Sequence, residues 1–366
     1  MAAKWNPDVR RSSVGFGLKH RVIEAGFRAI AATRADRWLA PIARGRGVIL
    51  TFHHVRPARD DPFQPNALLA ITPQHLDTTL RVVVDLGFDL VSLDDVPDRL
   101  RAGEGARPFC ALTFDDGYRD NRDHALPVLR RYGAPWTLFV TADYASGQGR
   151  LWWLELEEVI RRQDSLTLRR ADGSIAELPT RDPAEKLAAF ATAYAALRAG
   201  PEDALRDTIA GWCADAGLDT GDLVRRNCMS WDELGDLAPE PGLTIGAHTL
   251  THPMLAKHDV DRAVLEIDGG RSAIAEKLGV VSRHLSYPVG DPTSAGPREF
   301  GFAADAGYAT AVTTRPGHVF GEHAAHLMAL PRVSVNGLYQ SEAAVRALLS
   351  GVPFLLWNKG RRASVG

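Results

Sequence analysis

Short apolar runs, bounded by turn-forming residues, dominate the hydrophobic pattern of the chain. Runs of this length without polar alternation are typical of strands buried on both faces, as in a parallel sheet. We therefore predict strands at residues 48–52, 88–93, 109–114, 136–141, 243–247, 284–287, 308–313 and 330–335.

Longer segments with helical spacing of apolar residues separate several of these runs, at residues 73–86, 121–132, 259–278 and 298–306. A strand followed by a helix, repeated, predicts an α/β fold with a parallel sheet or barrel. The chain has 366 residues, 45% of them hydrophobic, which suffices for a large core without disulfides. We expect one catalytic domain over residues 46–340.

Roughly a hundred residues separate the fourth predicted strand from the fifth, far more than an ordinary connection needs. We place an insertion there, at about residues 148–232. Its tryptophans, Trp152 and Trp153, favour packing against the barrel over the alternative of stacking on sugar rings. Within it we predict a polar hairpin around residues 171–174 and helices at 184–198 and 201–214.

Both ends of the chain lie outside this pattern. Residues 1–45 form an amphipathic helical segment in which arginines interleave with apolar residues. This favours a helix packed on the barrel, with peripheral contact to a membrane surface as the alternative. Because a continuous apolar signal sequence is lacking, we expect a cytoplasmic protein. The C-terminal tail, 341–366, has an apolar stretch too short to span a bilayer.

The overall charge narrows the possible partners. Lysines and arginines number 43 and aspartates and glutamates 45, for a formal charge of −2, so we expect no nucleic-acid partner. The three cysteines, Cys110, Cys213 and Cys228, are odd in number and far apart. This predicts unbridged thiols in a reducing compartment and excludes a zinc site of the CxxC type.

Candidate chemistry follows two of the predicted strands. Asp115 and Asp116 come after the strand at 109–114, and His248 and His252 come after the strand at 243–247. Taken alone, each pair could be ordinary polar residues of a solvent-exposed loop. Loops that follow parallel strands share one face of a barrel, however, and two histidines with one carboxylate form a metal site with open positions. Pro253 favours a turn over a helix at the histidine pair.

These residues lie in recognisable motifs. TFDDG at 113–117 and HTLTH at 248–252, in that order, resemble the first two motifs of the polysaccharide deacetylases, the NodB-homology family that includes chitooligosaccharide deacetylases. The resemblance runs from about residue 48 to 335, the insertion excepted, and implies an irregular (β/α) barrel. It also implies that Asp116, His248 and His252 bind a divalent metal, usually zinc, and that Asp115 is the catalytic base.

The third family motif is only partly matched, by SYPVG at 286–290. The resemblance puts Tyr287 and Val289 on the substrate side, with a backbone N–H near Val289 as a donor to the oxyanion. The family often has arginine at position 286 to orient the base. We expect Arg332 to replace it by reaching Asp115 from the neighbouring strand end.

The late Leu-x-His motif, whose histidine is the general acid, is not evident, although His318, His323 and His326 lie nearby in the sequence. TFHHV at 51–55 resembles the opening of the permuted branch that deacetylates poly-N-acetylglucosamine, where an N-terminal histidine is the acid. We choose His53 over His54 for this role.

The sequence thus predicts a hydrolase that removes N-acetyl groups from N-acetylglucosamine-containing oligo- or polysaccharides. Two alternatives stay open. One is a deacylase or deformylase of a lipid-linked, amide-bearing sugar at a membrane surface. The other is a carbohydrate-binding relative without turnover.

Overall fold

The computed structural model describes residues 9–102, 105–170, 172–362 and 365. The chain divides into two compact units. The barrel unit comprises residues 30–59, 68–151 and 219–366, and the insertion unit comprises residues 1–29, 60–67 and 152–218.

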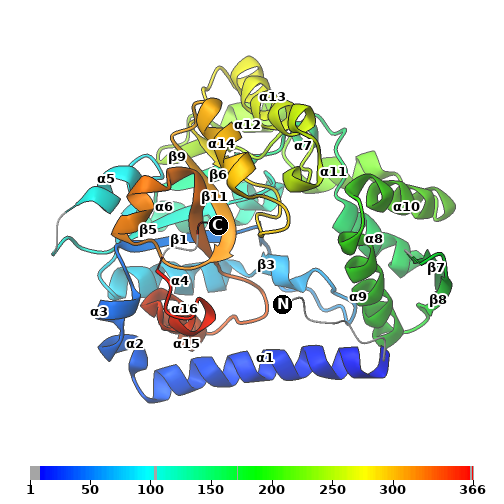
Figure 1. Ribbon diagram of the computed structural model, residues 1–366, viewed down its shortest axis with the longest axis horizontal. Coiled ribbons are helices and arrows are strands. Elements are labelled where there is room, and N and C mark those ends of the chain that lie inside the picture. Colours follow the sequence, from blue (N-terminus) through cyan, green and yellow to red (C-terminus); the bar gives the residue numbers. More distant parts are fainter. Residues whose placement is uncertain (1–8, 103–104, 171, 363–364, 366) are drawn as a thin grey trace. The chain divides into compact units, whose positions relative to one another are not determined.

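A closed barrel of seven parallel strands forms the centre of the barrel unit (Figure 1). The ring closes because β1 pairs with β12 on one edge and with β5 on the other. The order of strands around the ring is β1-β12-β11-β10-β9-β6-β5 and back to β1. The predicted (β/α) barrel is therefore confirmed. Its strands are β1 (Gly47–Phe52), β5 (Phe109–Phe114), β6 (Trp136–Val140), β9 (Leu243–Ala247), β10 (His284–Ser286), β11 (Thr310–Pro316) and β12 (Leu330–Ser334).

An eighth strand, β4 (Asp89–Val91), lies outside the ring. It pairs with residues 109–111 of β5, whereas β6 pairs with residues 112–114 of the same strand. Since β1 pairs along the whole of β5, β4 and β6 share the opposite edge of β5. Every apolar run predicted to be a strand is a strand in the structure, with ends shifted by a few residues.

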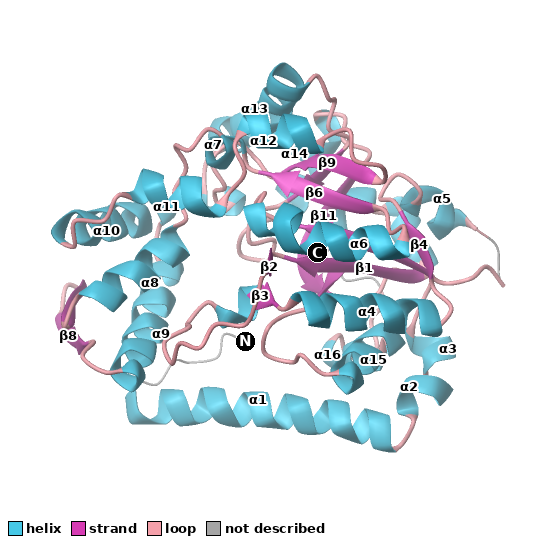
Figure 2. Ribbon diagram, turned by 180° about the vertical axis from the view of Figure 1, so that it is seen from behind, coloured by secondary structure: helices cyan, strands magenta, loops and turns pink. Residues whose placement is uncertain are grey.

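Helices surround the barrel, as the alternation of strands and helices predicts (Figure 2). The predicted helix at 121–132 begins with a π-helical turn, Asn121–Ala125, before it continues as α6. The helices of the barrel unit are α2 (Ala35–Trp38), α3 (Ala40–Ala43), α4 (Pro73–Asp85), α5 (Val96–Arg101), α6 (Leu126–Tyr132), α7 (Ala142–Ala145), α11 (Thr220–Asn227), α12 (Trp231–Leu237), α13 (Val260–Leu278), α14 (Pro297–Asp305), α15 (Glu342–Ser350) and α16 (Val352–Trp357).

The strands are buried along nearly their whole length, which explains why their sequences are continuous apolar runs. Aromatic rings fill part of the core: Phe52 stacks on Phe114 with ring centroids 4.9 Å apart, and Phe114 meets Trp136 edge-on at 5.4 Å. All three cysteines are buried and none forms a disulfide, as expected.

A second, two-stranded parallel sheet follows β1 in the chain. It consists of β2 (His54–Val55) and β3 (Ala70–Ile71).

The insertion unit contains the predicted hairpin and both predicted helices. Trp152 and Trp153 are buried, and the Trp152 ring lies 5.3 Å from Tyr194, so its contacts are those of a packed core residue. Among the described residues no helix is long and apolar enough to cross a membrane. The elements of this unit are most of α1 (Val9–Ala32), α8 (Trp152–Arg162), β7 (Ser165–Arg169), β8 (Ile175–Pro179), α9 (Pro183–Ala199) and α10 (Glu202–Asp215).

Candidate metal centre

Three predicted ligands converge at the carboxyl ends of the barrel strands. Asp116 follows β5, and His248 and His252 lie in the turn that follows β9. Their ligand atoms all lie within 4.8 Å of one another, and all three residues are buried. Asp116 Oδ1 is 3.4 Å from His248 Nε2 and 3.3 Å from His252 Nε2.

This geometry fits a metal ion. Two ligand atoms that each lie about 2.1 Å from a tetrahedral zinc ion are about 3.4 Å apart. Asp116 Oδ1 is buried and accepts no hydrogen bond from the described residues. Burying a carboxylate oxygen in this way is costly unless a cation satisfies it. The donor set, one carboxylate and two imidazoles, is typical of catalytic zinc sites.

The ring of His248 is held by a second contact. Its Nδ1 lies 2.6 Å from the carbonyl oxygen of Ser286 at the end of β10. Because a carbonyl oxygen only accepts, this contact places the proton on Nδ1 and leaves the Nε2 lone pair directed at Asp116. Histidine ligands of metals commonly have such a partner on the other ring nitrogen.

The backbone is strained at the same place. Six non-glycine residues of the described chain have positive φ, and four of them lie in the three motifs: Asp116 (71°), Thr249 (64°), His252 (61°) and Val289 (62°). This conformation is rare for a β-branched residue such as Val289. Strain of this kind persists only where surrounding contacts enforce it, and it is concentrated at functional sites. As Pro253 predicts, the histidine pair lies in a turn and not in a helix.

Glu266 of α13, which the sequence analysis did not identify, enforces the histidine turn. One carboxylate oxygen accepts from the N–H groups of Leu250 (3.1 Å) and Thr251 (2.8 Å), and the other accepts from the Thr251 hydroxyl. One helical turn later, a β-carbon at Gly270 would lie 2.6 Å from the carbonyl carbon of Thr249. α13 therefore packs tightly against the turn, which requires glycine at 270.

Asp115 forms a bidentate ion pair with Arg332 of β12. Arg332 Nη1 donates to Oδ1 at 2.8 Å, and Nη2 donates to Oδ2 at 2.7 Å. Nη2 also donates to the hydroxyl of Ser286 at 2.9 Å. Burial alone would raise the pKa of Asp115, but the charge and hydrogen bonds of Arg332 outweigh it and lower that pKa. Asp115 is therefore ionised at neutral pH.

The prediction that Arg332 reaches Asp115 from the neighbouring strand end was wrong in one detail. Arg332 lies on β12, which is not the neighbour of β5, because β1 lies between them in the ring. Arg332 reaches Asp115 across the interior of the barrel, where its side chain is fully buried.

His53 and His54 have different surroundings. His53 is partly exposed, and its electrostatic neighbours are Asp115, Asp116, Arg332 and His248. Burial lowers the pKa of His53, although the two carboxylates raise it. His54 is buried and its Nδ1 lies 2.7 Å from Asp120 Oδ2, so its ring is held away from the role predicted for His53.

The chain after the TFDDG motif holds this histidine segment in place. Asn121 Nδ2 donates to the carbonyl oxygen of His53 at 2.7 Å, and Asp120 Oδ1 accepts from the N–H of Val55 at 3.2 Å. The Tyr118 ring stacks on His54 at 3.6 Å. These positioning residues follow directly after the motif, in and before the π-helical turn, but nothing in their spacing predicts their contacts.

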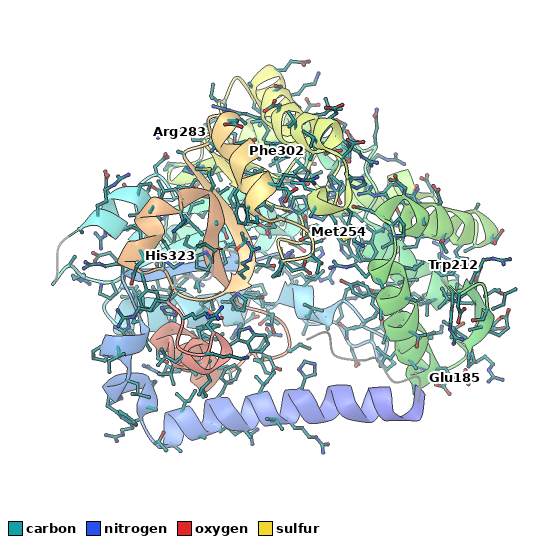
Figure 3. The ribbon with its side chains drawn as sticks, in the orientation of Figure 1. Glu185, Trp212, Met254, Arg283, Phe302 and His323 are labelled. Atoms are coloured by element: carbon teal, nitrogen blue, oxygen red, sulfur yellow. The ribbon has the colours of Figure 1, made fainter. Side chains whose placement is uncertain are left out.

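The remaining predicted residues lie elsewhere. Tyr287 is a core residue whose hydroxyl donates to the carbonyl oxygen of Met328 at 2.9 Å, so its side chain is not available to a substrate. Val289 is partly exposed in the turn after β10. His318 and His323, the latter labelled in Figure 3, are buried and contact backbone groups. His326 is exposed.

Replacing Glu266 with alanine should weaken the histidine turn and metal binding together, because three donors lose their acceptor. We expect the free energy of unfolding to fall by about 2–4 kcal/mol. Glu276→Ala, on the exposed face of the same helix, is the matched control. Urea unfolding and zinc titration measure both effects, and equal behaviour of the two variants would contradict the positioning role.

Comparison with known proteins agrees with this geometry. The family model for polysaccharide deacetylases matches residues 102–172 and 209–310, which include both aspartates and both histidines but neither His53 nor Arg332. A search of curated proteins finds no significant match.

Among solved structures, the deacetylase PplD of Streptococcus pyogenes, in complex with acetate, has a TM-score of 0.52 at 17% identity, covering 80% of this chain and 92% of that one. A polysaccharide deacetylase from Bacillus cereus has a TM-score of 0.49 at 14% identity, covering 82% and 68%. IcaB from Ammonifex degensii has a TM-score of 0.48 at 18% identity, covering 83% and 96%. PplD shares the fold. With its two ordered motifs and its closed parallel barrel, the chain is similar to the polysaccharide deacetylases, and residues 102–172 and 209–310 match the model of that family.

Proposed function

We propose that this protein is a metal-dependent hydrolase that removes N-acetyl groups from N-acetylglucosamine-containing oligo- or polysaccharides. The match to the polysaccharide deacetylase family supports hydrolysis of a carbon–nitrogen bond. The observation that carries the proposal is the bidentate ion pair between Asp115 and Arg332, next to the cluster of Asp116, His248 and His252. An ionised base beside a metal site is an arrangement suited to metal-assisted amide hydrolysis.

The residues that would hold the metal are Asp116, His248 and His252, and we infer zinc from the donor set. When bound, zinc supplies a water of lowered pKa and polarises the amide carbonyl. The chain itself fixes the ligands: Ser286 orients the ring of His248, and Glu266 fixes the turn that carries His252.

Asp115 is the proposed base. Its carboxylate is kept ionised by Arg332, and both oxygens are oriented by the guanidinium fork. It would accept a proton from the attacking water, a role that contributes about 10²–10⁴-fold to the rate. Val289, on its strained turn, remains the proposed position of a backbone donor to the oxyanion.

His53 is the proposed general acid, which protonates the leaving amine nitrogen. Its lowered pKa makes the protonated imidazole a stronger acid, while the protonated fraction at neutral pH becomes smaller. Asn121 donates to the carbonyl oxygen of His53 and so holds the backbone that carries this imidazole.

Substitutions at the two aspartates should separate metal binding from catalysis. Asp116→Ala removes one of three protein ligands and should abolish zinc retention and activity together. Asp115→Asn should retain zinc and lose about 10²–10⁴-fold in turnover. Elemental analysis of the purified variants and acetate release from N-acetylated chitooligosaccharides measure both. Full zinc occupancy in Asp116→Ala would reject the ligand assignment, and a metal-loaded wild type without acetate release would favour a binding protein.

Arg332→Lys should keep the charge but lose the fork, so the base is misplaced and its pKa rises towards the usual value. Asp115 acts as a base only while it is ionised, so its lowered pKa keeps the enzyme active down to low pH. If the substitution raises this pKa, activity should be lost at a higher pH on the acid side of the profile. We expect turnover to fall about 10–100-fold with zinc retained. Arg315→Lys, a buried arginine on β11 that contacts the Ala295 carbonyl, is the control and should leave the pH profile unchanged.

His53→Ala should lower turnover on acetamides with zinc content unchanged. An aryl acetate, whose leaving group needs little protonation, should lose much less activity than an N-acetyl sugar. His54→Gln serves as the control: it should lower stability, because it disrupts a buried contact with Asp120, and affect both substrates equally. Equal losses in His53→Ala would assign this histidine a structural role.

A further inference from the structure

Helices from the two ends of the barrel unit pack together. α3 contacts α16, and α2 contacts α15; the four helices lie side by side in both views (Figures 1 and 2). Gly351, between α15 and α16, has φ of 77°, and a β-carbon there would collide with the carbonyl oxygen of Ala43. His318 Nδ1 lies 2.8 Å from Arg44 O, and Nε2 lies 2.8 Å from Leu348 O. We call the surface formed by residues 33–46 and 351–362 the terminal face.

The terminal face exposes large apolar side chains. Trp38, Ile42, Leu356 and Trp357 are 63%, 57%, 82% and 61% exposed. Trp38 and Trp357 are the only tryptophans of the described chain that are classed as exposed. The Trp38 indole N–H donates to the carbonyl oxygen of Thr33 at 3.2 Å, so the ring is oriented and still open to solvent. Exposed apolar groups gathered from two distant segments indicate an interaction surface.

The same face is strongly basic, although the chain as a whole has a formal charge of −2. Residues 33–46 and 351–362 contain seven lysines and arginines and one acidic residue, Asp36. Asp36 is buried and interacts electrostatically with Arg44, so it offsets one of the seven cations and leaves a clear basic excess. The exposed basic residues of this face are Arg34, Arg37, Lys359, Arg361 and Arg362.

We propose that the terminal face docks the protein on an anionic lipid bilayer. Tryptophan prefers the interface between hydrocarbon and headgroups, and lysine and arginine are attracted to anionic headgroups. A second copy of the chain fits less well, because a symmetric contact would set two strongly basic surfaces against each other. A polyanion such as a nucleic acid would pair with the arginines but leave Ile42 and Leu356 in water. The proposal is independent of the deacetylase assignment.

Flotation of the full chain tests it, with vesicles of one part phosphatidylglycerol to two parts phosphatidylcholine and with pure phosphatidylcholine. The wild type should bind the anionic vesicles, and high salt should weaken the binding. Trp357→Ser combined with Lys359→Gln should lower the partition coefficient about tenfold or more. Leu265→Ser combined with Lys277→Gln, which also removes one exposed apolar and one basic residue but on α13, should bind as the wild type does.

Equal binding by both double variants, or equal binding to both kinds of vesicle, would overturn the proposal. A monomer–dimer equilibrium that the Trp357→Ser/Lys359→Gln variant abolishes, without binding to vesicles, would overturn it in favour of self-association. Acetate release from soluble chitooligosaccharides should be the same in both double variants, because none of these residues belongs to the metal centre.

Discussion

Two adjacent carboxylates are buried at the end of one barrel strand, and most of the site follows from the need to compensate their charge. Asp115 and Asp116 are almost fully buried, where an uncompensated negative charge would be very costly. Arg332 compensates Asp115 with a fork of two hydrogen bonds. Asp116 has no such partner and faces two imidazole nitrogens at 3.3–3.4 Å, which is the geometry that a divalent cation would complete.

Closure of the barrel supplies these partners from distant parts of the chain. The ring places β10 and β12 so that Ser286, Arg332 and Asp115 meet in its interior. The tight turns after β5 and β9 need positive φ at Asp116, Thr249 and His252, and neighbouring elements enforce them. Glu266 accepts the turn's N–H groups, and Gly270 allows α13 to approach. The proposed metal ligands therefore depend on contacts outside the two motifs.

The barrel and the cluster of Asp116, His248 and His252 could be predicted from the sequence because each depends on a local pattern. Continuous apolar runs predict buried strands, and the motifs follow those runs directly. The supporting residues were not accessible in this way. Glu266 is the one acidic residue on the buried face of α13, so helical spacing could have singled it out, but not the turn whose N–H groups it accepts. Asn121 acts through its contact with a backbone carbonyl 68 residues earlier. Tyr287 is the converse case, a residue that the sequence analysis assigned to the site and the structure places in the core. Its position in a motif suggested a substrate contact, but its hydroxyl donates to the carbonyl oxygen of Met328.

The departure from the family pattern at position 286 has a physical explanation in the same contacts. Ser286 Oγ lies 2.9 Å from Arg332 Nη2 and 3.3 Å from Asp115 Oδ2, so it occupies a position between the guanidinium and the carboxylate. An arginine at 286 would bring a second guanidinium to a carboxylate whose two oxygens are already paired, in a fully buried space. Such a second cation would be desolvated without a partner of its own. The small hydroxyl at 286 and the arginine at 332 are thus parts of a single arrangement, in which the cation for the base enters from β12.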